Sequence, residues 1–263
     1  MALNVWALAI VKATGTEVAA VQMVFLRAAT GLAVMVPWIV LDRAAFAHAR
    51  RPGLHLLRVA LSTLTLTASF HAVARLPLAL FTALNFTRPL VMIALATLFL
   101  AEPATTRRWL AAGVGLAGVV IAVGPTGSAD PALLAAAVAV VAGTSAIVVT
   151  RKLVDQPPVV LMTAYTAGLG AATALPALWA WTSVAPKAWP VLLAVGVLAQ
   201  SAQLCFLRAH RLARAGVLAV AGYASLLIST TMGWAAFGEV PTPAFWLGAG
   251  LIVAATWTAR PGT

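Results

Sequence analysis

One feature limits what this chain can fold into more than any other: apolar stretches of roughly 20 residues follow one another along its whole length. Ten such stretches lie between short polar connections, at residues 1–14, 18–41, 55–76, 78–101, 105–124, 131–150, 158–182, 188–207, 215–237 and 242–259. A helix of this length crosses a bilayer because it satisfies its own backbone hydrogen bonds. A soluble fold is excluded, since charged residues make up 9% of the chain against about 25% in soluble domains. The sequence predicts an all-α integral membrane protein with ten transmembrane helices.

The positive charges fall mainly in alternate connections. If the N-terminus is cytoplasmic, twelve Lys and Arg residues lie in or beside the cytoplasmic connections, and only Arg75 and Lys187 lie on the other side. The positive-inside rule then places both termini in the cytoplasm, and we expect a multi-pass protein of the cell (inner) membrane. The net charge of +11 is explained by these loops, so no nucleic-acid partner is predicted. The expected partners are the lipid bilayer and a small-molecule substrate, and a homodimer is compatible with the sequence.

The chain also contains an internal repeat. The segment "EPATTRRWL" at 102–110 aligns with "EVPTPAFWL" at 239–247, matching Glu102 with Glu239 and Trp109 with Trp246. Each copy holds five stretches, an odd number, so the halves 1–125 and 126–263 must insert with opposite orientation around a central cavity. The two glutamates then lie on opposite membrane faces, which excludes a catalytic pair. We expect each glutamate to cap or pair locally and each tryptophan to anchor its helix at the membrane interface.

These segments resemble the EamA family of the drug/metabolite transporter superfamily. The resemblance rests on "FLRAATG", "HAVARLPLAL", "FTRPLVMIALATLFLAEPATTRRWLAAGVGLAGVVIAVGP" and the second-half counterpart "GWAAFGEVPTPAFWLGAGLIVAA", and it covers essentially the whole chain. It implies a bundle whose cavity opens alternately to each side, with small metabolites, amino acids or drugs as cargo, usually exported. Two departures are a short first helix and Ser225–Leu226 where many relatives have a proline.

Arg88 and Pro89 stand near the middle of the stretch 78–101. An arginine at the bilayer centre costs about 2.5–3.5 kcal/mol even on the lenient insertion scale. Arg88 is about 15 Å of helix rise from the nearer end, too far to reach the interface, so it must face the protein interior. Pro89 also frees the carbonyl of Asn85. We predict that Arg88, Asn85 and Pro89 line the substrate site, with Arg88 holding an anionic group. The alternative is that Arg88 clamps carbonyls of a neighbouring helix.

Two further cations lie within apolar stretches. Arg27 is about ten residues into its stretch, so the reasoning for Arg88 applies to it, whereas Lys12 is close enough to the outer end to reach the interface. Both are candidates for the cavity. None of the six Asp and Glu residues lies in the middle of a stretch, so these cations lack an obvious carboxylate partner. The substrate itself can supply the negative charge, which favours a carboxylate- or phosphate-bearing cargo. Without a buried carboxylate as a proton relay, facilitated diffusion or exchange fits better than proton antiport.

Other polar residues recur on single helix faces. Gln200, Gln203, Tyr223 and Ser225 are predicted to line the cavity, because large polar groups facing lipid would be costly. The stripe of Arg58, Ser62, Thr65 and Ser69 on the third stretch is better explained by bonds within or between helices. Four glycines, Gly113, Gly118, Gly170 and Gly248, are predicted to allow close helix packing.

Enzyme activity is not expected. Intramembrane aspartyl hydrolysis needs two buried aspartates, and a zinc site needs clustered His, Cys or carboxylates, whereas the four histidines are dispersed along the chain. We therefore predict no catalytic residues, no metal and no cofactor. The function that fits best is secondary transport, as an exporter working by alternating access. The alternative is a membrane protein that handles lipid head groups, or serves as a scaffold, without transporting a solute.

Overall fold

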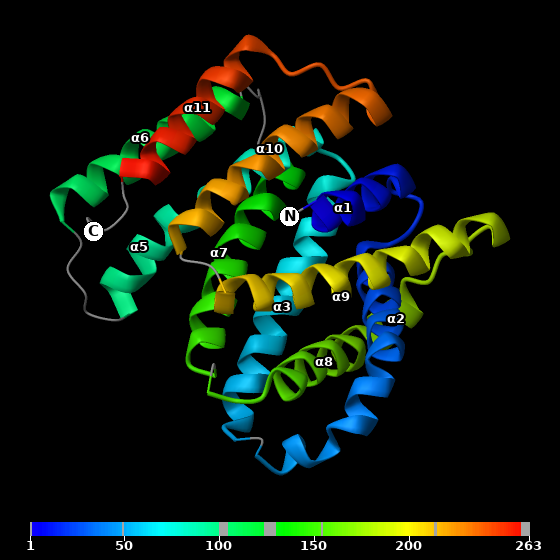
Figure 1. Cartoon of the computed structure of the whole chain (residues 1–263). Coiled ribbons are helices and arrows are strands. Elements are labelled where there is room, and N and C mark those ends of the chain that lie inside the picture. The colour runs from blue at the N-terminus through cyan, green and yellow to red at the C-terminus, as the bar shows by residue number, and fades with distance from the viewer. Residues whose placement is uncertain are drawn as a thin grey trace.

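The computed structural model describes residues 2–48, 50–99, 105–123, 130–153, 155–212 and 215–258. Within these ranges the chain folds into α-helices and two short 3₁₀ helices, with no β-strand (Figure 1). The helices are α1 (Ala2–Thr14), α2 (Ala20–Leu41), η1 (Arg43–His48), α3 (Pro52–Val73), α4 (Leu78–Asn85), α5 (Arg88–Phe99), α6 (Thr106–Val123), α7 (Pro131–Arg151), α8 (Pro158–Trp179), η2 (Pro186–Ala188), α9 (Trp189–Leu212), α10 (Ala215–Phe237) and α11 (Pro243–Thr258). The all-helical architecture predicted from the sequence is confirmed.

Six helical segments of the described chain are long and apolar enough to cross a membrane: Ala20–Leu41, Pro52–Val73, Leu78–Leu95, Pro131–Arg151, Pro158–Trp179 and Pro186–Cys205. Four shorter apolar helices coincide with the other predicted stretches: Ala2–Thr14, Trp109–Val123, Ser225–Phe237 and Pro243–Ala255. The boundaries agree with the prediction to within a few residues. The largest shift is at the end of α9, which continues to Leu212 beyond the predicted end at 207. Helix α3 begins at Pro52, three residues early, because the proline ring is already suited to the first turn of a helix.

The helices pack in pairs, with one helix from each half of the chain. Helix α6 lies beside α11, α2 beside α8 and α4 beside α10 (Figure 1). In addition, α3 packs against α7 and α8, while α9 packs against α1 and α2. Each of these contacts joins the first half of the sequence to the second, so the two halves form a single bundle.

Two glycines bring the backbones of α6 and α11 into contact. A Cβ atom at Gly118 would lie 2.7 Å from the carbonyl oxygen of Gly248, and one at Gly248 would collide with the backbone of Gly118 and Ala122. The predicted close-packing role of these two glycines is confirmed. It is wrong for Gly113 and Gly170, because a Cβ would meet nothing within 4 Å at the first and only an ordinary contact at the second.

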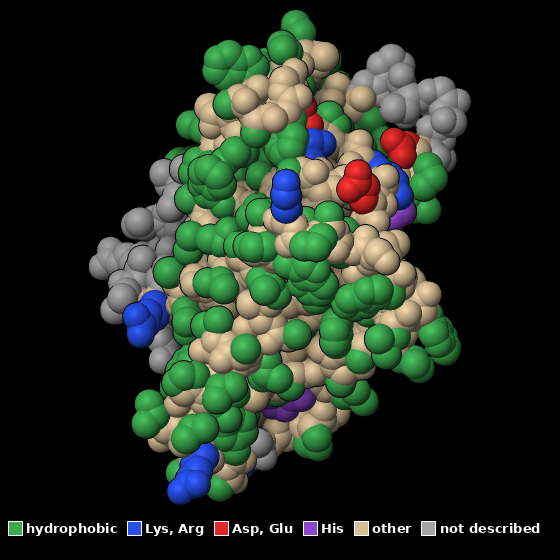
Figure 2. All heavy atoms as spheres, turned by 90° about the vertical axis from the view of Figure 1, so that its right-hand side faces the viewer, with side chains coloured by type: hydrophobic (Ala, Val, Ile, Leu, Met, Phe, Trp, Pro, Cys, Tyr) green, Lys and Arg blue, Asp and Glu red, His purple; other side chains and the backbone are tan. Residues whose placement is uncertain are grey.

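The largest cluster of buried apolar residues draws on α1, α2, α3 and α4 of the first half and on α7, α8 and α9 of the second. Helix α1 contributes Val5 and Val11 to it, so this helix of 13 residues is held by its neighbours although it rises only about 20 Å. Large apolar side chains such as Leu134 and Leu178 are exposed on the outside of the bundle. Figure 2 shows hydrophobic side chains across the middle of one face, with acidic side chains confined to its upper part. This surface suits a lipid environment.

Candidate functional site

The segment predicted as one helix from 78 to 101 is divided in the membrane-spanning region. Helix α4 ends at Asn85 and α5 begins at Arg88. Pro89 has no N–H to offer to the Asn85 carbonyl, and the chain tightens instead: the N–H groups of Phe86 and Thr87 donate to carbonyls three residues earlier, at 3.0 and 3.1 Å. The predicted consequence of Pro89 is confirmed, and it is a break between two helices.

Polar side chains of this segment bond to its own backbone. Thr82, Asn85 and Thr87 donate to carbonyls three or four residues earlier, at 2.9, 2.8 and 2.7 Å. The carbonyl of Thr87 then accepts the first hydrogen bonds of α5, from Leu90 and Val91. A helix N-terminus carries a partial positive charge. Arg88 is the first residue of α5, so the chain at this N-terminus also carries a side chain with a full positive charge.

The Arg88 guanidinium lies against α7, next to α3. A Cβ atom at Gly143 of α7 would lie 3.2 Å from Arg88 Nη2 and 3.1 Å from Thr65 Cγ2. The Nε atom of Arg88 is buried and has no hydrogen-bond partner in the described part of the chain. A buried donor without a partner costs about 1–3 kcal/mol, and more when the group is charged. This part of the bundle therefore holds a positive charge that is not fully satisfied by the protein.

A second group of cations surrounds Tyr165 of α8. The Cζ atom of Arg58 lies 5.1 Å from the centroid of the tyrosine ring, and that of Arg27 lies 6.0 Å from it. Arg27 Nη1 also lies 3.4 Å from the hydroxyl oxygen of Tyr165, while Arg58 Nη1 donates to the carbonyl of Leu161 at 3.0 Å. Cation–π contacts of this kind are attractive within about 6 Å. One aromatic ring thus holds two arginines, from α2 and α3.

The described residues supply no carboxylate to these three arginines. The two ion pairs found among the described residues involve Lys12 and Arg51 instead. Of the six acidic residues in the sequence, Asp130 caps α7 by accepting from the N–H of Ala132 at 2.8 Å, and Glu102 lies outside the described residues. Arg27, Arg58 and Arg88, which we together call the cationic interior, therefore have no acidic partner among the described side chains.

Lys12 is engaged at the end of the bundle where α1 stops. Its Nζ donates to the carbonyl of Leu76 at 2.6 Å and lies 2.8 Å from Glu239 Oε1. The other carboxylate oxygen accepts from the N–H of Leu78, the first residue of α4, at 2.9 Å. The expectation that Glu239 pairs locally is wrong, because both partners belong to the first half of the chain. Helix packing, which brings α1, α4 and the α10–α11 connection together, decides this pairing.

The remaining predicted cavity residues are dispersed. Gln200 is buried between helices, where its amide donates to the sulfur of Met35 at 2.6 Å and its carbonyl oxygen would lie 3.1 Å from a Cβ at Gly31. Gln203 and Ser225 are partly buried, on α9 and α10. Tyr223 belongs to α10, but its side chain lies outside what the structure describes.

Trp109 and Trp246, the tryptophans of the repeat, are each 48% exposed. This equal exposure is compatible with the predicted interface anchors.

Three residues at the cationic interior were not recognised as parts of a site from the sequence. Gly143 and Tyr165 contact arginines from other helices, and Arg58 was interpreted as structural. The polar stripe on α3 is the sequence signal that could have found Arg58, since it aligns Arg58 with Thr65 on one helix face. Nothing local marks Gly143 or Tyr165.

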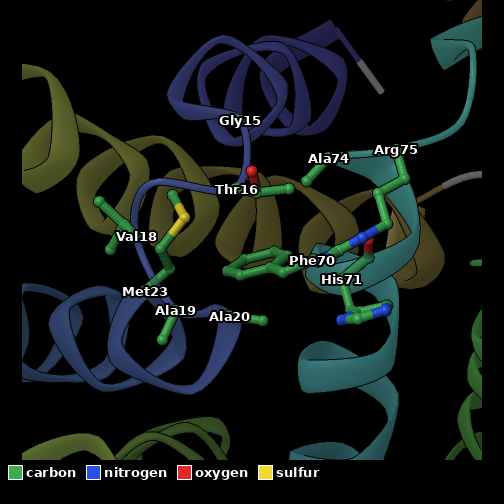
Figure 3. A pocket seen from close by; sticks show the side chains of 10 residues that line it. All are labelled: Gly15, Thr16, Val18, Ala19, Ala20, Met23, Phe70, His71, Ala74 and Arg75. Carbon is green, nitrogen blue, oxygen red and sulfur yellow. The ribbon is translucent and has the colours of Figure 1, made fainter. Parts of the chain in front are cut away.

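A hollow of about 210 Å³ opens at the same end of the bundle as Lys12. It lies between the α1–α2 connection and the last turn of α3 (Figure 3). Phe70 lies between Met23 on one side and His71 on the other, and Arg75 folds back so that its Nη1 donates to the His71 carbonyl at 3.0 Å. The hollow is an opening at one end of the bundle, apart from the Arg88 region.

Comparison with known proteins gives a consistent result. The sequence profile of the EamA-like transporter family matches residues 2–124 and 130–259. A riboflavin transporter of Brucella anthropi is 29% identical over 252 residues, which cover 92% of this chain and 88% of that protein. An S-adenosylmethionine uptake transporter of Rickettsia felis is 26% identical over 93% of this chain and 84% of its own length. A pseudopaline exporter of Pseudomonas aeruginosa is 28% identical over 94% and 88%.

A solved crystal structure has the same fold, with a TM-score of 0.70 over 98% of this chain and 94% of the other, at 21% identity.

Proposed function

This chain belongs to the EamA-like transporter family, and we propose that it exports a small metabolite bearing a carboxylate or phosphate group by alternating access. It is a membrane transporter, as are the relatives that match nearly its whole length. The relatives include both an uptake transporter and an exporter, so the proposed direction, export, rests on the family resemblance alone. We further propose that it resides in the inner membrane with both termini in the cytoplasm, as the loop charges indicate.

We propose that residues 1–125 and 126–263 are repeats of opposite orientation. The two separate matches to the family profile support two repeats. The packing supports a two-fold relation: if α1, α2, α3, α4–α5 and α6 correspond to α7, α8, α9, α10 and α11, then α2–α8, α4–α10 and α6–α11 are contacts between equivalent helices. If each helix is replaced by its equivalent in the other half, the contact of α3 with α7 becomes the contact of α9 with α1, and the structure contains both contacts. Transporters built in this way bind their substrate near the midplane, between the repeats.

The main observation in favour of an anionic cargo is the Nε of Arg88, at the start of α5, which has no hydrogen-bond partner among the described residues. Broken helices in transporters direct the positive N-terminus of a half-helix at anionic groups of the substrate. Arg88 adds a guanidinium whose geometry suits a carboxylate or a phosphate. The Asn85 amide donates to the Phe81 carbonyl of its own helix, just before the break. We therefore propose that Arg88 holds the anionic group of the cargo at the α4–α5 break.

Arg27 and Arg58 extend the same cationic interior towards α2 and α8. Their contacts with Tyr165 hold both guanidinium groups in place without neutralising them. We propose that they attract the cargo on its way to or from Arg88, and that Gln203, Tyr223 and Ser225 line the path on the side of α9 and α10. Gln200 is proposed to shape this wall from its buried position.

The test uses purified protein in lipid vesicles. A thermal-shift screen of amino acids, organic acids and amphiphilic drugs selects ligands, and the flux of each hit is then measured. We expect Arg88→Ala to reduce the flux of anionic hits by at least about tenfold, because it removes a charge-assisted hydrogen bond of about 1.5–3 kcal/mol. Arg107→Ala is the matched control, since Arg107 is exposed in the first turn of α6 and its loss should not change the flux.

Two outcomes would overturn the proposal. If Arg88→Ala left the transport of anionic and neutral cargoes equally intact, the charge would have no role. Lipid scrambling without saturable solute flux would favour the alternative, a protein that handles lipid head groups. Flux is also measured in vesicles that contain the protein inserted in each orientation, and protease accessibility of the loops identifies the orientation. Comparing the two gives the direction of transport.

A further inference from the structure

Lys12, Leu76, Leu78 and Glu239 form a connected set of contacts at one end of the bundle, which we call the Lys12 end. Lys12 and Glu239 are mostly buried, with side chains 12% and 18% exposed. The Lys12 ammonium also lies 5.5 Å from the centroid of the Phe237 ring. The single carboxylate thus binds both the end of α1 and the start of α4.

The backbone around Glu239 is built to hold this carboxylate. Gly238 has φ = +66°, a left-handed conformation that glycine adopts without strain. The N–H of Glu239 then donates to the carbonyl of Gly233 at 3.0 Å. A Cβ atom at Gly233 would lie only 2.6 Å from Glu239 Oε2, so any larger residue there would push the carboxylate away. Two glycines of the α10–α11 region therefore direct the carboxylate towards the first half of the chain.

Resting on the proposed function, we infer that the Lys12–Glu239–Leu78 contacts form a latch that closes this end, and that Glu239 is a positioning residue for Arg88. Alternating access requires the two halves to separate at one end at a time. Lys12 and Leu78 belong to the first half and Glu239 to the second, so separation at the Lys12 end must break the ion pair. Helix α4 spans only 8 residues, about 12 Å of rise, between Leu78 and the break before Arg88. A displacement of its start is therefore passed on to the Arg88 guanidinium.

The opposite end, which we call the Arg51 end, is held differently. Arg51 Nη2 lies 3.8 Å from Asp155 Oδ2, and both side chains are more than half exposed. An exposed pair at this separation contributes little. Arg51 Nη1 also donates to the Lys152 carbonyl, and the neutral side chain of Gln156 bonds with His55 and with the Arg50 carbonyl. This end therefore has hydrogen bonds between the halves but no buried ion pair among the described residues. The partly buried ion pair thus biases the resting protein towards closure at the Lys12 end.

The latch can be tested by cysteine labelling with N-ethylmaleimide in detergent, without any cargo. Cys205 is free and exposed, so it is first replaced by serine. Thr82→Cys reports on the Lys12 end, because Thr82 is buried one turn beyond Leu78, and Val149→Cys reports on the Arg51 end, where it packs with Leu153. We expect Glu239→Gln to speed labelling of Thr82→Cys by roughly tenfold, as the population opens at that end. Labelling of Val149→Cys should be unchanged or slower.

Matched variants separate a latch from general loosening. Asp155→Asn removes the exposed pair and should leave labelling of Thr82→Cys unchanged. The exchange Lys12→Glu with Glu239→Lys restores opposite charges and should restore slow labelling. If Glu239→Gln protein does not fold, Lys12→Met gives the same readout while leaving Glu239 bonded to Leu78. Faster labelling of both reporters together, or no change at Thr82→Cys, would overturn the latch.

Transport kinetics test the positioning role separately. Glu239→Ala removes the acceptor of the Leu78 N–H and should raise the KM of the anionic substrate several-fold above that of Lys12→Met, which breaks the ion pair but keeps that bond. Equal KM values for the two variants would overturn the positioning role. Because labelling needs no cargo, a failure of the latch leaves the transport proposal standing, and an absence of flux leaves the labelling result standing.

Discussion

Replacing Gly143 by alanine tests whether the position of the Arg88 guanidinium controls substrate binding. The added Cβ would lie 3.2 Å from Arg88 Nη2 and 3.1 Å from Thr65 Cγ2, so the neighbours must yield by a few tenths of an ångström. The end of an arginine side chain yields more easily than a methyl group fixed to a packed helix. The substitution should therefore move the guanidinium and leave α3 and α7 in place.

The expected effect is moderate. A hydrogen bond to a charged group contributes about 1.5–3 kcal/mol. Displacing the guanidinium without removing it should forfeit a part of this, about 1 kcal/mol, which corresponds to roughly fivefold weaker binding. Alanine is also about 1 kcal/mol more favourable than glycine inside a helix, which offsets the local crowding, so the folded protein should keep its thermal stability.

The assay is the initial rate of flux into proteoliposomes as a function of the concentration of an anionic substrate. Gly143→Ala should raise KM roughly fivefold with kcat little changed. Gly170→Ala is the control, because its Cβ would make only a 3.7 Å contact with Ala28, and its KM should equal that of the parent. An unchanged KM in Gly143→Ala protein, or an equal rise for a neutral substrate, would refute the reasoning.

Three further substitutions have distinct expected outcomes. Gly248→Ala should destabilise the protein by about 1–3 kcal/mol, because its Cβ would collide with the α6 backbone. Gly250→Ala should not, because its Cβ would meet nothing within 4 Å, so coinciding melting curves for the two variants would contradict this prediction. Pro89→Ala supplies the N–H missing at the helix break and should raise the melting temperature while lowering flux, so unchanged flux would argue against a role for the break. Tyr165→Phe removes a hydroxyl that lies 3.4 Å from Arg27 and should reduce flux less than Tyr165→Ala, which removes the ring; equal losses would show that the ring contacts are unimportant.

Local sequence signals predicted the helices and the disturbance at Pro89. The apolar stretches defined the helices because the length needed to cross a bilayer is fixed. Pro89 predicted the disturbance of its helix because a missing N–H acts within one turn. The inward direction of Arg88 followed from the cost of exposing a charge to lipid, and it agrees with the packing of the guanidinium against Gly143.

Contacts between helices could not be predicted in the same way. The pairing of Lys12 with Glu239 and the position of Tyr165 between two arginines depend on how each helix is rotated about its axis. That rotation is decided by packing over the whole bundle. The four glycines illustrate this, because Gly118 and Gly113 stand in one helix and only Gly118 faces α11.

The most direct measurement is an experimental structure of the protein with a transported anionic substrate bound. We predict that the carboxylate or phosphate oxygens lie about 2.7–2.9 Å from the Arg88 guanidinium nitrogens, at the break between α4 and α5 and between the two halves of the chain. A substrate bound elsewhere, with the Arg88 guanidinium bonded only to protein carbonyls or directed at lipid, would contradict this mechanism.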